Sequence, residues 1–168
     1  MVNNSLTLDY TNAREDVQDV NTLLQKLLDR FYRKFDGIVY ENGVFSNEVD
    51  WYLRMTTNGG VTKESDHYYV WGETSKITAY SAKVDLTLFN RLEIVAKNQG
   101  STVNTVLVGI ASDVPLEHTD FNIASQATQT TKKTHVFDVS NLSGEYYIGS
   151  TGFEGTYRSD IYSIKLFK

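Results

Sequence analysis

Most of this chain is made of short segments in which apolar and polar residues alternate. Alternation with a period of two is the pattern of a β-strand that has one face buried and one face exposed. The stretches between these segments are rich in Gly, Asn, Asp, Ser and Thr, which are typical of turns. Eight strands are predicted in this way, over residues 49–56, 68–72, 76–81, 91–97, 103–112, 133–139, 146–150 and 161–167. Strands of this length and number favour two packed antiparallel sheets, a β-sandwich.

One short motif occurs twice, each time directly before a strong strand. Residues 84–87 read Val-Asp-Leu-Thr and residues 137–140 read Phe-Asp-Val-Ser, so each has an Asp between two apolar residues and a hydroxyl after them. Side chains of Asp, Ser and Thr hydrogen-bond to nearby backbone amides and thereby close turns. We therefore expect two equivalent arches that carry the chain from one sheet to the other, with an architectural and not a catalytic role.

Residues 12–37 have a different pattern, which predicts one amphipathic α-helix. Asn12 followed by Glu15 is a capping-box signal for the start of this helix, and Gly37 suits the position just after its end. Five basic and five acidic residues make residues 13–36 neutral, so the whole net charge of −5 lies elsewhere. The apolar stripe of this helix recurs at alternate spacings of three and four residues, at Val17, Val20, Leu24, Leu27 and Phe31.

Two interpretations of this helix stay open. Its apolar stripe either packs on the domain that follows, or joins identical chains in a short parallel coiled coil, with a trimer favoured by the breadth of the stripe. About two to three heptads are marginal on their own, so an oligomer needs further contacts from the rest of the chain. The predicted domains are residues 1–37, for oligomerisation or anchoring, and residues 38–168, a β-sandwich in which the place of residues 38–82 is open.

Composition and charge exclude several classes of protein. The absence of cysteine excludes disulfide scaffolds, thiolate nucleophiles and Cys-based metal centres. A net charge of −5 with no basic run argues against binding to nucleic acid. No apolar stretch approaches the roughly 18 residues that a membrane span needs, and the first ten residues do not read as a signal peptide. We therefore expect no membrane insertion, and synthesis in a cytoplasm without Sec-type export.

Few residues point to catalysis or to metal binding. The three histidines are far apart in the sequence, and none has the spacing of a metal ligand pair. Ser65-Asp66-His67 cannot act as a triad if the segment is extended, because adjacent side chains then point to opposite faces. Residues 117–120, Glu-His-Thr-Asp, offer oxygen ligands for calcium, although a solvated loop is the simpler interpretation. No pair of carboxylates stands out, so we predict no enzyme and no cofactor, with calcium the one metal to consider.

The second half of the chain resembles a module of bacteriophage tail and appendage proteins. The resemblance rests on residues 83–94, KVDLTLFNRLEI, on VGIAS at residues 108–112, on FDVSNLSGEYYIG at residues 137–149, and on residues 161–166. Such modules are jelly-roll sandwiches similar to carbohydrate-binding modules. The resemblance implies a mainly β fold class, in which an N-terminal α-helix precedes a jelly-roll antiparallel β-sandwich, in a virion protein made in the host cytoplasm. Its implied partners are other virion proteins, copies of the same chain and a saccharide of the host cell wall.

Aromatic residues supply the candidate contacts with a saccharide. The chain has 11 Tyr, 8 Phe and 2 Trp, and aromatic faces stack on the apolar C–H surface of sugars while planar polar side chains bind the hydroxyls. In the clusters at residues 51–52 and 68–71, neighbouring side chains face opposite ways if the segments are strands, so at most half are exposed. A loop predicted at residues 150–160 combines glycines, an aromatic ring and charged groups. The candidate saccharide-binding residues are Trp71, Tyr157, Arg158 and Asp160.

These observations favour a non-catalytic virion or appendage protein whose sandwich contacts a host-surface saccharide and whose N-terminal helix assembles it. An alternative keeps the fold without saccharide binding, as a decoration, adaptor or head-fibre protein. A third interpretation is the accessory domain of a small glycan hydrolase.

Overall fold

Short strands joined by turns make up the described part of this protein. The computed structural model describes residues 20, 22, 35–55, 58–72, 77–100, 106–153 and 158–168. Its elements are β1 (Ile38–Glu41), β2 (Val44–Phe45), β3 (Asp50–Met55), β4 (Gly59–Lys63), β5 (Tyr68–Gly72), β6 (Ile77–Asp85), β7 (Arg91–Asn98), β8 (Leu107–Ala111), the 3-10 turn η1 (His118–Asp120), β9 (Ala124–Ala127), β10 (Lys133–Asp138), β11 (Glu145–Phe153) and β12 (Ser159–Phe167).

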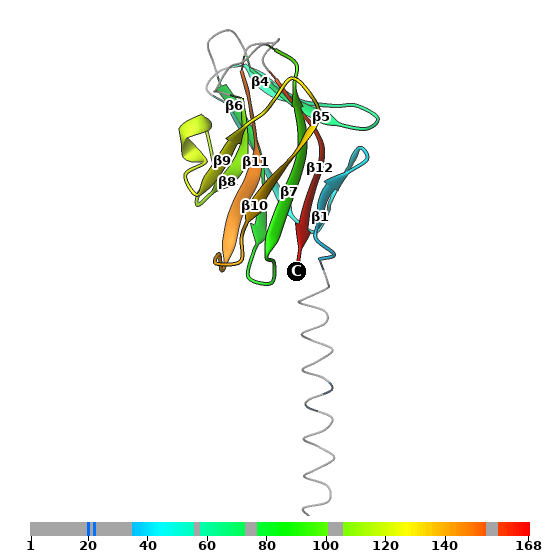
Figure 1. The fold of residues 1–168 in the computed structure, drawn as a ribbon, viewed down its shortest axis with the longest axis vertical. Coiled ribbons are helices and arrows are strands. Elements are labelled where there is room, and N and C mark those ends of the chain that lie inside the picture. Colours follow the sequence, from blue (N-terminus) through cyan, green and yellow to red (C-terminus); the bar gives the residue numbers. More distant parts are fainter. Residues whose placement is uncertain are drawn as a thin grey trace, which may run out of the picture. The chain divides into compact units, whose positions relative to one another are not determined.

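The strands form two antiparallel sheets that pack as a sandwich (Figure 1). The seven-stranded sheet has the order β10-β7-β12-β1-β2, and β5 also pairs with β12 and carries β4 on its other side. The five-stranded sheet has the order β3-β6-β11-β8-β9. Because β12 pairs with β7 along its whole length and with β5 and β1 in turn, it is the centre of the larger sheet.

The alternation that predicted the strands decides which side chains enter the core. Along β7, predicted as a strand over residues 91–97, every second residue is buried, and Leu92, Ile94 and Ala96 on one face are fully inaccessible. Ile161, Ile164 and Leu166 of β12 are also buried, but a register shift between Ile161 and Ser163 breaks the strict alternation there. The predicted β-sandwich is therefore confirmed, with one irregularity that a period of two does not contain.

The two predicted arches are present, and each joins one sheet to the other. In the first, the Asp85 carboxylate accepts hydrogen bonds from the Thr87 backbone N–H at 2.9 Å and from its hydroxyl at 2.6 Å, between β6 and β7. In the second, Asp138 accepts the same two bonds from Ser140 at 3.0 and 2.7 Å, between β10 and β11. The hydrogen bonds from Ser140 lower the pKa of Asp138. The repeated motif is therefore a turn-closing device.

Five aromatic rings from both sheets meet in the core and settle where residues 38–82 belong. Tyr40, Phe45 and Tyr68 come from the seven-stranded sheet, and Trp51 and Tyr80 come from the five-stranded sheet. Trp51 and Tyr80 stack at 4.9 Å between ring centroids, and Tyr68 lies 6.2 Å from Trp51 and 5.5 Å from Tyr80. Burial raises the pKa of Tyr40 and of Tyr80 to about 12. Residues 38–82 therefore supply strands to both sheets and part of their shared core.

The predicted fold class is wrong in one part, the N-terminal α-helix. No α-helix is among the elements of the described chain, which are strands and one 3-10 turn. Most of residues 12–37 lie outside the described residues, and with them four of the five stripe positions, Val17, Leu24, Leu27 and Phe31. The fifth, Val20, is described and is 55% exposed.

Gly37, read from the sequence as the residue that ends this helix, has another role. Its φ is +85°, and a Cβ there would lie 2.2 Å from the backbone oxygen of Leu166. Its own carbonyl accepts a hydrogen bond from the Leu166 N–H at 2.7 Å. The glycine is thus required by the close approach of the chain to β12 just before β1 begins.

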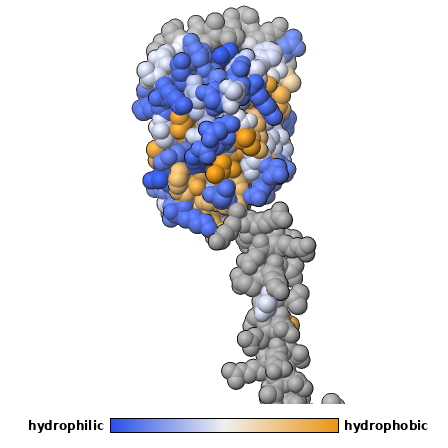
Figure 2. Space-filling model, turned by 90° about the vertical axis from the view of Figure 1, so that its right-hand side faces the viewer, coloured by the Kyte–Doolittle hydropathy of each residue, from blue (hydrophilic) through white to orange (hydrophobic). Residues whose placement is uncertain are grey.

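The chain separates into two compact units, residues 1–36 and residues 37–168, and the second is the sandwich. That the first unit serves oligomerisation or anchoring stays a prediction. No helix in the described part of the chain has the length and apolar character of a membrane span. On the side of the sandwich that Figure 2 displays, hydrophobic side chains form small patches among hydrophilic ones.

Candidate functional site

The outward-facing surface of the seven-stranded sheet, called here the outer face, carries an unusual set of side chains. Along β5, Tyr68 and Val70 are buried in the core while Tyr69 and Trp71 are only partly buried, so these two point outward. Tyr69 is paired across the strands with Asp160 of β12, and Asp160 with Lys97 of β7, so all three share the outer face. Asp160 is fully buried among these residues.

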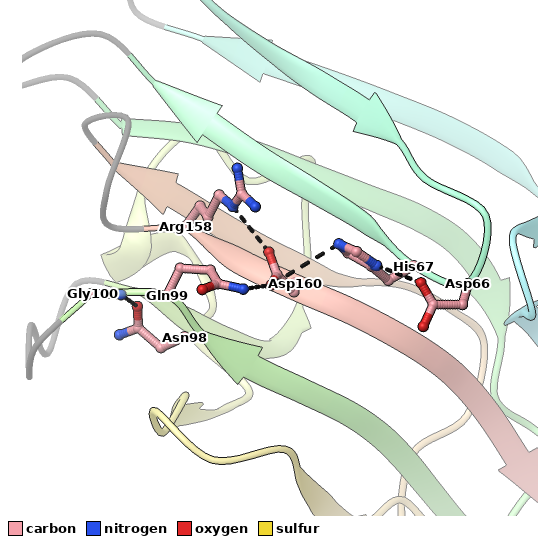
Figure 3. Close-up of polar contacts among 7 residues, drawn as sticks. All are labelled: Asp66, His67, Asn98, Gln99, Gly100, Arg158 and Asp160. Carbon is pink, nitrogen blue, oxygen red and sulfur yellow. Dashed lines mark hydrogen bonds and ion pairs between the residues drawn. The ribbon is translucent and has the colours of Figure 1, made fainter.

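Asp160 is a buried carboxylate held by residues on both sides (Figure 3). Its Oδ1 accepts a hydrogen bond from the Arg158 Nε at 3.1 Å, and its Oδ2 accepts one from the side-chain amide of Gln99. Gln99 follows β7 directly, and its backbone N–H also donates to the carbonyl of Arg158 at 3.2 Å. A buried charge is tolerated when it is paired and hydrogen-bonded, and both conditions are met here. Asp160 therefore positions Arg158 and Gln99 on the outer face.

His67 lies between two carboxylates. Its Nδ1 is 2.8 Å from the Asp66 Oδ1, and its Nε2, which is buried and has no hydrogen-bond partner among the described residues, is 4.0 Å from the Asp160 Oδ2. The hydrogen bond to His67 is the main cause that lowers the pKa of Asp66. Figure 3 shows the imidazole ring between these two acids.

The same histidine is the middle member of a stack of five side chains across the outer face. Its ring centroid is 6.3 Å from that of Tyr69 and 5.1 Å from that of Tyr162, with both rings tilted by 33°. The guanidinium of Arg158 lies 3.7 Å from the Tyr69 ring centroid, and the ammonium of Lys132 lies 3.7 Å from that of Tyr162. Partial burial, followed by the nearby Asp160 and Asp66, raises the pKa of Tyr162. Because cations cover a face of each tyrosine, these rings are less available for stacking than Trp71.

Trp71 lies directly on the backbone of the neighbouring strand. It is paired with Gly60 of β4, and a Cβ at Gly60 would come within 3.2 to 3.3 Å of three indole atoms, Cζ2, Cε2 and Nε1. Glycine allows the ring this close approach, since a side chain at residue 60 would need the indole to shift by a few tenths of an ångström. Trp71 thus stands on the outer face against β4, two residue pairs beyond Tyr69.

Three of the four predicted saccharide-binding residues lie on the same face of the sheet, and the fourth is outside the described residues. Trp71, Arg158 and Asp160 share the outer face, whereas Tyr157 is not among the described residues. The loop predicted at residues 150–160 is shorter than expected, because β11 continues to Phe153 and β12 starts at Ser159. Asp160 is therefore a strand residue that holds Arg158, and not an exposed loop residue.

Several members of this site were not predicted from the sequence. Tyr69 and Tyr162 were within reach, because each alternates with a buried neighbour, Tyr68 or Ile161. Gln99 carried no signal, since its partner Asp160 is 61 positions away. Ser65-Asp66-His67 was excluded as a triad for an extended segment, but the chain turns there, with the Glu64 N–H donating to the His67 carbonyl at 2.8 Å. Asp66 and His67 therefore meet, although no bond to Ser65 completes a triad in the described structure.

Metal ligands are scarce in the part of the chain that the structure describes, where no group of three or more His, Asp or Glu side chains could hold an ion. At the loop predicted to suit calcium, Asp120 accepts hydrogen bonds from the backbone N–H groups of Leu116 and Glu117 at 2.7 and 3.0 Å. Glu117 accepts one from the Thr119 hydroxyl at 3.0 Å. These carboxylates close a turn around η1, and calcium binding there stays a prediction.

Comparison with known proteins places this fold beside carbohydrate-binding modules. No family model and no curated protein matches the sequence. Among solved structures, a family 29 carbohydrate-binding module from Piromyces equi matches with a TM-score of 0.54 and 16% identity, over 78% of this chain and 89% of that module. A variant of such a module complexed with cellulohexaose matches with a TM-score of 0.53 and 15% identity, over 76% and 86%. Another, complexed with mannohexaose, has a TM-score of 0.53 and 13% identity, over 76% and 87%.

Identities this low show the fold alone. The class that the fold defines is thus a jelly-roll-like β-sandwich of the kind found in carbohydrate-binding modules, and nothing in these matches indicates a bacteriophage origin.

Proposed function

We propose that this protein binds a saccharide on the outer face of its seven-stranded sheet, with Trp71 as the stacking platform. The observation that carries the proposal is the indole of Trp71 lying on Gly60, on the same face as an Arg158 side chain that a buried carboxylate holds over Tyr69. Stacking supplies affinity for the apolar face of a sugar ring, and the guanidinium and the Gln99 amide offer donors for its hydroxyls.

The likeness to carbohydrate-binding modules supports the choice of ligand. Two of the similar structures hold cellulohexaose and mannohexaose, which are neutral linear oligosaccharides. The proposed activity is binding without catalysis, as is usual for modules of this class. Cello- and manno-oligosaccharides are therefore the first ligands to test.

A comparison of Trp71→Ala with Tyr52→Ala tests this proposal. Tyr52 is a matched control, because it lies on the outward side of the five-stranded sheet, where it contacts Tyr147 at 5.3 Å. In isothermal titration with cellohexaose and mannohexaose, we expect Trp71→Ala to weaken binding at least tenfold, which corresponds to about 1.4 kcal/mol. Tyr52→Ala should bind as the unchanged protein does. Equal affinities of the two variants, or no binding by the unchanged protein, would refute the proposal.

We also propose, on the sequence resemblance of residues 83–94 and 137–149, that this binding serves a virion protein at a host surface. Other virion proteins, and copies of this chain, would then be its partners. Immunogold labelling of particles of a phage whose genome carries this gene would test that location, and unlabelled particles would contradict it. A purely structural virion role would be favoured if the protein labels particles but binds no saccharide.

A further inference from the structure

A pocket lined by polar residues lies at the end of β7. Its volume is about 330 Å³, and it is lined by Asn98, Thr128, Gln129, Thr130 and Thr131. This volume is at the lower end of the range of small-molecule pockets, about 300 to 1,000 Å³. Among the described residues of this lining, the polar side-chain groups are amides and hydroxyls, which both donate and accept hydrogen bonds, and none is charged. The lining therefore suits a neutral, hydroxyl-rich ligand.

The walls of this pocket are held in place by hydrogen bonds. Asn98 is 2% exposed, its side-chain oxygen accepts from the Gly100 N–H at 2.8 Å, and its backbone N–H donates to the Gln129 carbonyl at 2.7 Å. The Thr128 hydroxyl donates to the Val106 carbonyl at 3.0 Å. A preorganised wall lowers the entropic cost of ordering the site when a ligand binds.

Both sides of the pocket continue directly into the outer face. Asn98 precedes Gln99, whose amide binds Asp160, and Thr131 precedes Lys132, whose ammonium covers Tyr162. In Figure 1, the segment that follows β9 crosses the end of β7 before it enters β10. The pocket and the outer face are thus joined through the backbone of residues 98–99 and 131–132, with the Asn98 side chain on the inward side of β7 and Gln99 at the edge of the outer face.

We propose that this pocket is a second sugar subsite, which takes one neutral ring of an oligosaccharide whose neighbouring rings lie on the outer face toward Trp71. The inference rests on the proposed function and extends it, because it makes the site specific for oligosaccharides over single sugars. Trp71 supplies the stacking contact, and the pocket supplies hydrogen bonds to hydroxyls.

The test measures affinity as a function of ligand length. Glucose, cellotriose and cellohexaose, and the corresponding mannose series, are titrated into the full chain and into the double variant Thr130→Val, Thr131→Val. Valine keeps the shape of threonine and removes only the hydroxyl, and both residues are exposed, so the fold should stay intact. Thr119→Val, an exposed threonine outside the pocket and the outer face, is the control.

We expect the unchanged protein and the control to bind the trisaccharide at least tenfold more tightly than the single sugar. The double variant should lose most of this gain and keep its affinity for the single sugar. A full gain with length in the double variant, or no gain in the unchanged protein, would overturn the subsite and leave saccharide binding at Trp71 intact. Failure of the unchanged protein to bind any ligand of either series would overturn the proposed function, and this inference with it.

Discussion

Asp160 is the residue on which the arrangement of the outer face depends. It is fully buried, and its two oxygens bind Arg158 and Gln99. We predict that Asp160→Asn lowers the free energy of unfolding by about 1.5 to 3 kcal/mol, because Arg158, whose side chain is 27% exposed, loses its counter-charge. Urea denaturation at neutral pH measures this loss. Asp138→Asn is the control, since Asp138 is exposed and, within the described part of the chain, bonded to Ser140 alone. A loss equal to that of the control would contradict the prediction.

His135 makes stability depend on pH through another buried group. Gln126 donates to the Val136 carbonyl at 2.8 Å, so its amide oxygen faces His135 Nδ1 at 3.1 Å and accepts a hydrogen bond from it. His135 Nε2 is buried and has no hydrogen-bond partner among the residues that the structure describes. Burial, followed by the charge of Lys133, lowers the pKa of His135. The unfolded chain then binds the proton more readily than the folded protein, so stability is full above the unfolded value of about 6.5 and falls as the pH drops below it.

Comparison with His135→Gln isolates this contribution. We predict that the free energy of unfolding of the unchanged protein, measured by urea denaturation, falls more steeply between pH 7 and pH 5 than that of the variant, with a difference in slope of at most about 1.4 kcal/mol per pH unit. Parallel pH profiles would show that His135 does not titrate in the way its burial indicates.

At the scale of single residues, the sequence pattern indicated which side chains face outward but not which residues they contact. It indicated that only half of the aromatic residues in 68–71 face outward, and β5 has this alternation. Trp71, Arg158 and Asp160 were selected for their residue types, and the last two also as members of a predicted loop that is shorter in the structure. The pairing of Asp160 with Gln99 and His67 joins three distant segments, and no local pattern records such a contact.

Gly152 shows how one element depends on another. It lies in β11 of the five-stranded sheet, yet a Cβ there would come within 1.9 Å of the Val70 carbonyl oxygen and 2.8 Å of the Trp71 backbone nitrogen in β5. Gly152→Ala must therefore push the two sheets apart next to Trp71. We predict a loss of about 1 to 3 kcal/mol in unfolding free energy and a weaker affinity for saccharide.

Gly144→Ala is a control for this prediction, because it is destabilising for another reason. Gly144 has a φ of +94° and nothing within 4 Å of an added Cβ, so alanine there costs backbone strain alone, about 1 to 3 kcal/mol. Urea denaturation and saccharide titration, both on fully folded samples, separate the two effects. If both variants bind saccharide as the unchanged protein does, the link between Gly152 and Trp71 is refuted.

The elements that the sequence predicted are those with strong local patterns. The two arches are recovered in detail, because Asp85 and Asp138 each bond a hydroxyl residue two positions on. The strands β1, β2, β4 and β9 were missed as strands, since they have two to five residues, and β4 begins with two glycines. Their pairing depends on neighbours from distant parts of the chain, and strand propensity does not contain that information.

At the scale of the whole molecule, the sandwich was predictable and the predicted helix was not supported. Spacing of apolar residues and capping signals report local preference, and tertiary contacts can use the same residue for another purpose, as Gly37 shows beside β12. The prediction that the net charge lies outside residues 13–36 had a firmer basis, since these residues are neutral by composition alone.

The sandwich should be stable without the N-terminal unit. Every buried hydrophobic side chain in the described part of the chain lies between Val39 and Leu166, and all the described strand pairings fall within residues 37–168. We predict that a protein shortened to residues 37–168 unfolds in one cooperative urea transition, with a free energy within about 1 kcal/mol of the full chain, since single domains of this size are usually two-state. It should also bind saccharide with unchanged affinity, because Trp71 and Arg158 remain. A broad transition, or an affinity that drops on removal of residues 1–36, would show that the first unit contributes to the fold or to the site.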